Sequence, residues 1–313
     1  DVTGTASIDY STMFNVLLEY GTTNTIVGGI APGERNILSG AQYGVVFSDQ
    51  NTYQCSVIGN YIGTDVTGTK AVPNSNGLDS NVSGYHRIGG TNPGEGNVIS
   101  GNNGCGVGIR QNIVVIGNTV GYAADGETPL PNDTGISLYS GSIIGGFTPE
   151  EGNRILSKTF AVRSAMQGAA QNYIAGNTFV NEQNSGLWIE AEASRNFVQN
   201  NSIACYGKNQ FAVFIDGGTG NFIRGNTITL DKREDMIALV HHGNLDVPAP
   251  TVTSVAKKTV KGTTCAFGLV EIYLYANGEA TPIGHTVADH KGKFTFVYSE
   301  SLKGKKIVLL ATD

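Results

Sequence analysis

The sequence predicts an all-β protein: a parallel β-helix of about eight rungs, followed by a small C-terminal antiparallel β-sandwich module. Three observations carry this prediction. An Asn followed after one residue by an apolar residue recurs about every two dozen residues, and two strand-like segments recur with it. The 313 residues also contain 43 glycines and only 15% charged residues. Short strands repeated at a fixed period are typical of a solenoid, whose neighbouring rungs share one core.

The recurring Asn marks one turn of each rung. Its successive spacings are 24, 37, 21, 35, 24, 24 and 25 residues, so insertions lengthen two rungs. An Asn amide at such a turn can bond to the Asn of the next rung and to turn backbone, and we predict a structural ladder. Its members are Asn36, Asn60, Asn97, Asn118, Asn153, Asn177, Asn201 and Asn226.

Two further segments recur between these turns and read as strands. One alternates apolar and polar residues with period two and starts at Gly44, Gly77, Gly106, Gly135, Ala161, Gly186, Ala212 and Met236. The other precedes the Asn turn and contains Ile58, Ile88, Val115, Ile144, Ile174, Val198 and Ile223. With the segment after the Asn, each rung has three short strands parallel to their counterparts one period later.

Three loops at the same place in alternate rungs end in Glu34, Glu95 and Glu151. Their Gly-Gly pairs do not form a phosphate loop, because no Lys-Ser/Thr follows them. The carboxylates offer calcium ligands, but since they recur with the repeat we favour a turn-stabilising role. The sequence identifies no certain cofactor, and calcium is the ion that these loops could bind.

Gly59-Asn-Tyr-Ile-Gly-Thr-Asp-Val-Thr-Gly-Thr69, and Ile88-Gly-Gly with Gly96-Asn-Val-Ile-Ser-Gly-Asn102, resemble the repeats of bacterial right-handed parallel β-helix repeat proteins. The resemblance covers roughly residues 1–245 and implies a right-handed helix in a secreted or cell-surface protein. It implies no single reaction, because such repeats occur in glycan-active enzymes, adhesins and surface proteins of unknown role.

We place the parallel β-helix at residues 1–246 and a second module at 247–313. The first part has 12 basic and 21 acidic residues, a net charge of −9, and the second has eight basic and five acidic residues, a net charge of +3. Alternation predicts antiparallel strands at 270–274, 281–286, 293–297 and 306–310, with a turn at 289–292. This module resembles the immunoglobulin-like modules that follow such repeats.

Both ends of the chain fall inside a pattern. The first five residues recur as Asp65-Val-Thr-Gly-Thr69, so we expect a fragment that starts in the middle of a repeat and lacks N-terminal rungs and any secretion signal. The strand pattern of the second module would continue beyond Asp313, which suggests a missing final strand.

Several classes of function are not expected. No apolar run approaches 18 residues, so we expect no membrane insertion. No basic stripe is present, so nucleic acid is not an expected partner. His241 and His242 would point to opposite faces of a strand, which argues against a shared metal.

A side chain that recurs in every rung has a structural role in the stack. Candidates for function are therefore the outward side chains that differ between rungs. In the segments that start at Gly44 and its equivalents, outward positions break the pattern and form two columns. These columns contain Asp79, Arg163, Trp188 and Phe214, and two residues further on Arg110, Tyr139, Glu190 and Asp216.

Aromatic faces stack on sugar rings, and acids bond hydroxyls or act as acid and base, so this array predicts a glycan-binding face. Its substrate-binding candidates are Trp188, Phe214, Tyr139, Arg163, Arg110 and Asp79. Glu190 and Asp216 lie one rung apart, near the ~5 Å between the carboxyls of retaining glycosidases, and are the catalytic candidates. In the alternative, the acids are solvated surface and an insertion or partner chain covers the rings.

Three functions stay open. The first is engagement of a polysaccharide or cell-surface glycan along this face. The second is a structural or adhesive surface stalk without catalysis, and the third is a glycan lyase or glycoside hydrolase. In a uronate lyase an Arg would act as base and calcium would neutralise the sugar carboxylate.

Overall fold

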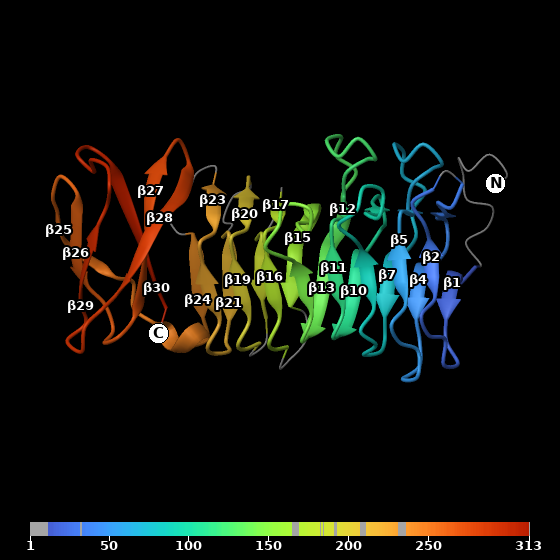
Figure 1. The fold of residues 1–313 in the computed structure, drawn as a ribbon, viewed down its shortest axis with the longest axis horizontal. Coiled ribbons are helices and arrows are strands. Elements are labelled where there is room, and N and C mark those ends of the chain that lie inside the picture. Colours follow the sequence, from blue (N-terminus) through green and yellow to red (C-terminus); the bar gives the residue numbers. More distant parts are fainter. Residues whose placement is uncertain are drawn as a thin grey trace.

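The protein is a rod of stacked rungs with an antiparallel module at its C-terminal end (Figure 1). The computed structural model describes residues 12–31, 33–164, 169–181, 183, 185–190, 193–206, 211–230 and 236–312. Among them, the 3₁₀ segment η1 (Gly243–Asp246) is the only helical element, and no helix has the length and apolarity to cross a membrane. The predicted all-β fold, a parallel solenoid of about eight turns with a small antiparallel module, is confirmed.

Each rung contributes to three stacks of parallel strands. Stack 1 precedes the Asn turn: β2 (Ile26–Gly28), β5 (Ser56–Ile58), β8 (Arg87–Gly89), β11 (Val114–Ile116), β14 (Ile143–Gly145), β16 (Tyr173–Ala175), β19 (Phe197–Gln199) and β22 (Phe222–Arg224). Stack 2 follows it: β3 (Ile37–Leu38), β6 (Tyr61–Ile62), β9 (Val98–Ile99), β12 (Thr119–Val120), β17 (Thr178–Asn181), β20 (Ser202–Cys205) and β23 (Thr227–Leu230).

Stack 3 is formed by the segments that start at Gly44 and its equivalents. Its strands are β1 (Phe14–Leu18), β4 (Tyr43–Phe47), β7 (Asn76–Ser80), β10 (Cys105–Gln111), β13 (Asn132–Ser140), β18 (Leu187–Ile189), β21 (Val213–Asp216) and β24 (Ile237–Val240). In one rung the long β15 (Arg154–Ser164) pairs with strands of both stack 2 and stack 3.

The inward side chains of stack 3 fill the solenoid core. They are completely buried in seven successive rungs: Val45, Leu78, Val107, Ile136, Val162, Leu187 and Val213. Because side chains alternate along a strand, this column fixes the next residue of each strand on the outer face. The core therefore positions the two predicted columns.

The predicted Asn ladder is present. Asn60 donates from its backbone N and its Nδ2 to Oδ1 of Asn97, at 3.0 and 3.1 Å, and Asn97 does the same toward Asn118. The Nδ2 of Asn60 also donates to the carbonyls of Val27 and Ile58. Each amide thus joins neighbouring rungs and holds the turn backbone.

Two further amide ladders were not predicted. One contains Asn74, Asn102 and Asn132, and the other contains Asn172, Asn196, Asn221 and Asn244. In an earlier rung His86 occupies the position equivalent to Asn172 in the second ladder. Its Nδ1 accepts the backbone N–H of Cys55 at 3.2 Å. The His86 ring stacks on Phe47, with 3.9 Å between centroids.

The loop acids hold their own turns. Glu34 accepts the N–H of Ala31 at 2.9 Å, Glu95 accepts that of Asn92 at 3.1 Å, and Glu151 accepts that of Thr148 at 2.9 Å. These bonds confirm the turn-stabilising role. Within the described ranges, no three His, Cys, Asp or Glu side chains come together as a metal site.

The C-terminal module contains two antiparallel sheets. One is β25 (Thr251–Val255), β26 (Thr259–Thr263) and β29 (Lys293–Val297), and the other is β27 (Leu269–Ala276), β28 (Glu279–Val287) and β30 (Lys306–Thr312). Val260 and Phe294 of the first sheet share a core with Val270 and Ile272 of the second. The sequence predicted four of these strands and missed β25 (TVTSV) and β26 (TVKGT).

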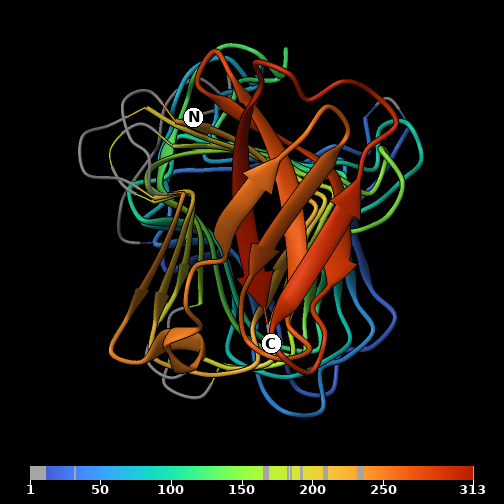
Figure 2. The same cartoon turned by 90° about the vertical axis from the view of Figure 1, so that its left-hand side faces the viewer.

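This module covers one end of the solenoid, as the end-on view shows (Figure 2). Strand β28 pairs antiparallel with β23, and Tyr273 of β27 lies in the solenoid core. Both Glu271 carboxylate oxygens accept the backbone N–H of Gly225 at 2.9 Å, and Tyr273 Oη donates to Glu271 at 2.8 Å. In earlier rungs a backbone carbonyl of the next turn takes this N–H, as Glu95 O does for Gly59.

We expect Asn177→Ala to lower the free energy of unfolding by roughly 3 kcal/mol, because it leaves the buried donors of Asn153 without an acceptor. Chemical and thermal denaturation followed by circular dichroism measure this. The matched control is Asn36→Ala, at an exposed member of the same ladder, which should cost less than half as much. Equal losses in the two variants would mean that burial of the ladder does not increase the stability that its bonds contribute.

We expect His86 to make stability depend on pH. Burial lowers the pKa of His86 to about 4, from 6.5. Between these values the unfolded chain binds a proton that the native state does not, so stability falls as pH drops from 6.5 to 4, by up to roughly 3 kcal/mol. His86→Asn places the residue type of later rungs at this position and should remove the contribution of His86 to the pH dependence. The measurement compares the melting temperatures of the variant and the parent between pH 6.5 and pH 4. Parallel curves for the two proteins would disprove it.

Candidate functional site

The predicted residues lie on the outer face of stack 3, across β7, β10, β13, β15, β18 and β21. Strand register places Asp79 beside Gly108, Gly108 beside Ser137 and Ser137 beside Arg163. The same column continues through Trp188 to Phe214. The face is therefore one continuous surface of six rungs.

A polar hollow occupies the first half of this face. Gly108 has no side chain between Asp79 and Ser137, and a cavity of about 150 Å³ lies there. Asp79, Arg110 and Tyr139 are among the residues that line it. The structure thus brings together three predicted residues from three successive rungs, with a carboxylate, a guanidinium and a phenol around one space.

Asp79 is a half-buried acid in this hollow. Burial raises the pKa of its carboxyl, while the backbone N–H of Ser80 and the charge of Arg110 oppose that rise. Keeping a charged carboxylate here costs stability, which is typical of a residue kept for a function rather than for folding.

An aromatic cluster occupies the second half of the face. Trp188 packs edge-on against Phe160, with 4.7 Å between ring centroids, and against Phe214 at 5.0 Å. Phe214 also contacts Phe211 at 5.8 Å. Trp188 and Phe214 are half-buried, and the Trp188 Nε1–H is buried without a hydrogen-bond partner among the described residues.

The two predicted catalytic acids both have charged or ionisable partners. Glu190 accepts two hydrogen bonds from Arg163, at 2.8 and 3.0 Å, and these bonds raise the pKa of the Arg163 guanidinium. Asp216 Oδ1 lies 2.6 Å from His241 Nδ1. The bidentate pair orients the Glu190 carboxylate, whereas the partner of Asp216 is an exposed imidazole.

Sequence reasoning missed four contributors to the face: Phe160, Phe211, His241 and Gly108. Phe160 and Phe211 come directly before predicted segments, and alternation within the segments did not reach them. His241 was placed on a strand, but β24 ends at Val240, and His241 has a φ of 47° in the turn that follows. Gly108 could have been found as the only Gly in its column.

Fold and site together describe a parallel β-helix with a hollow and an aromatic cluster along one strand face. No protein-family model and no curated protein matches the chain.

We expect Asp79→Asn to raise the melting temperature by about 1–3 °C at pH 7, because it removes a half-buried charge. The gain should vanish below about pH 4, where the carboxyl is protonated in both states. Asp65→Asn is the control and should lower the melting temperature at pH 7. Burial raises the pKa of Asp65, but hydrogen bonds from Thr67, Lys70 and Thr69 lower it further, so the charged carboxylate is stabilised in the native state. A loss of stability in Asp79→Asn at pH 7 would contradict the argument.

Proposed function

We propose that the protein binds a polysaccharide or cell-surface glycan along the outer face of stack 3. The observation that carries this proposal is the continuity of the polar hollow with the aromatic cluster on one strand face. A glycan chain has both apolar ring faces and hydroxyl groups, so it can use both halves of such a surface.

The aromatic half suits the faces of sugar rings. Trp188 and Phe214 come from adjacent rungs and are held by Phe160 and Phe211, so little conformational entropy is lost when a ligand contacts them. Arg163 and Glu190 stand beside Trp188 as a fixed pair whose remaining donor and acceptor sites suit hydroxyl groups. Aromatic anchors with adjacent polar groups are typical of binding sites.

The polar half suits the recognition of hydroxyl groups. Asp79 accepts hydrogen bonds, Arg110 donates them and Tyr139 can do either. They surround a space opened by the missing side chain of Gly108. This half would provide specificity and the aromatic half most of the affinity.

The partners of Glu190 and Asp216 favour binding over hydrolysis. A glycosidase needs one free carboxylate and one protonated acid, whereas Glu190 is bonded twice to Arg163 and Asp216 contacts His241. A stalk without any site remains the rival explanation of the solenoid, and a lyase or hydrolase is the second rival.

The proposal includes a setting outside the cell. It rests on the likeness of Gly59–Thr69 and Gly96–Asn102 to repeats of secreted and surface-displayed bacterial β-helix proteins. The strand pattern of residues 247–313 resembles that of immunoglobulin-like modules, and the proposal extends to an immunoglobulin-like fold for this part of the chain. On this proposal the glycan belongs to a cell surface or to an extracellular matrix.

We expect the intact chain to retain specific glycans on an array, and Trp188→Ala to weaken the best of them at least ~10-fold in calorimetry. Gly108→Val should weaken the same glycan, because its side chain would fill the hollow; even a Cβ there would lie 3.1 Å from Asp79 Oδ1. Phe197→Ala is the matched control, since it removes an exposed aromatic ring from stack 1 and should leave affinity unchanged.

Three results would count against this function. Retention of no glycan, or affinity unchanged in Trp188→Ala and Gly108→Val, would favour the stalk. Release of reducing ends or unsaturated uronate that is lost in Glu190→Gln or Asp216→Asn would establish an enzyme instead.

A further inference from the structure

The C-terminal module caps only part of the last rung. Strand β28 pairs with β23 and so occupies the place of a next rung in stack 2. In stack 3, by contrast, β24 pairs with β21 alone among the described strands, and β30 pairs with β27 alone. Two strand edges therefore border the same end of the solenoid without a strand between them.

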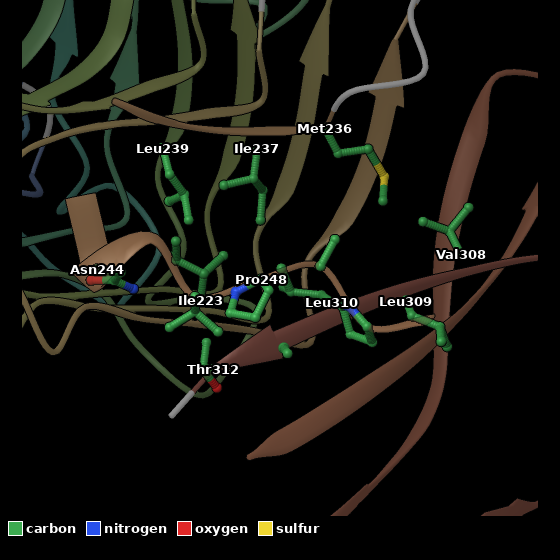
Figure 3. Close-up of a pocket in the computed structure, with 14 residues that line it drawn as sticks. Ile223, Met236, Ile237, Leu239, Asn244, Pro248, Val308, Leu309, Leu310 and Thr312 are labelled. Atoms are coloured by element: carbon green, nitrogen blue, oxygen red, sulfur yellow. The ribbon is translucent and has the colours of Figure 1, made fainter. Parts of the chain in front are cut away.

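The core beneath β24 is incompletely covered. Its inward side chains, Ile237 and Leu239, are half-buried. By contrast, the seven residues that precede Ile237 in its column, from Val45 to Val213, are completely buried. An apolar cavity of about 260 Å³ lies over them. Figure 3 shows Ile237 and Leu239 on the side of the last rung, with Val308 and Leu310 of β30 on the side of the module.

The free edge of β24 presents a regular hydrogen-bonding pattern. The carbonyls of Met236 and Val240 accept N–H groups of the preceding rung, from Val213 and Gly217. Because backbone groups alternate in direction along a parallel strand, those of Ile237 and Leu239 point away from β21, toward the open end. An added strand would find donors and acceptors here.

We propose that this edge binds an extended peptide segment of a partner protein, with aliphatic side chains at alternate positions, as an added strand on β24. The occupant is inferred from continuity with the β23–β28 ladder, where a strand is already added at the neighbouring position of the same rung. The cavity is the volume that the core side chains of a ninth rung would fill, so the alternate aliphatic residues of the segment enter it.

A second cavity extends the same groove. It shares Met236, Val308 and Leu309 with the first, has a volume of about 310 Å³ and reaches Tyr275. The linker contributes Pro248 and Pro250 to the wall, and neither has an N–H that could compete for the edge of β24. The groove is thus longer than β24 and has room for the flanks of the segment.

The probe is a fluorescein-labelled copy of residues 211–217 with added lysines, because this segment contains β21, the natural neighbour of β24. We expect saturable binding to the full chain by fluorescence polarisation, with Kd roughly 10–100 μM. Hydrogen–deuterium exchange of residues 236–240 should slow at least fivefold at saturation. A peptide with aspartate in place of Val213 and Ile215 should bind at least tenfold more weakly.

Variants locate the binding. Leu239→Asp should weaken binding of the unmodified peptide at least tenfold, and Val297→Asp, at an exposed residue of β29, should leave it unchanged. The aspartate peptide tests the same contact on unmodified protein, in case Leu239→Asp misfolds. No polarisation change up to ~1 mM peptide, or protection confined to other segments, would overturn the proposal. Saturable binding of decanoate without binding of the peptide would assign the cavity to a small apolar molecule and would also overturn it.

Discussion

The structure depends on the hydrogen bond from one side-chain amide to the amide of the next rung. Each such bond pairs buried polar groups of the turn and at the same time sets the register between neighbouring rungs. A slip of one residue would reverse the inward and outward columns of every strand, so register has to be fixed many times along the rod. Three ladders do this at three corners, and the outer face inherits its order from them.

The repeat explains why the fold was readable from the sequence. Asn177 and its equivalents recur at constant spacing, and Val213 and its equivalents alternate with outward residues, so local pattern and global fold agree. The other two ladders were not predicted because they are less regular. The position equivalent to Asn172 is occupied by His86 in an earlier rung, so the residue type does not repeat there. Strands β25 and β26 escaped because their Thr-rich pattern looks like that of a polar loop.

The site was less readable because it depends on distances between rungs. The sequence predicted which side chains face outward, and Asp79, Arg110 and Tyr139 do meet at one hollow. It did not reveal that Arg163 reaches Glu190 or that Asp216 meets His241, since these contacts depend on rotamers and on where β24 ends. Alternation predicts direction, but it does not predict which neighbour a long side chain selects.

Glu271 terminates the repeat from outside it. Its carboxylate stands where the backbone carbonyl of a further turn would be, and it accepts the N–H of Gly225, a group of the last turn alone. The length of the rod is therefore independent of its ending. Whole units of 24 residues, such as that from Asn153 to Asn177, can be gained or lost within the solenoid while the same terminal contact is kept. A lineage carrying this architecture can change the reach of its surface by duplication alone.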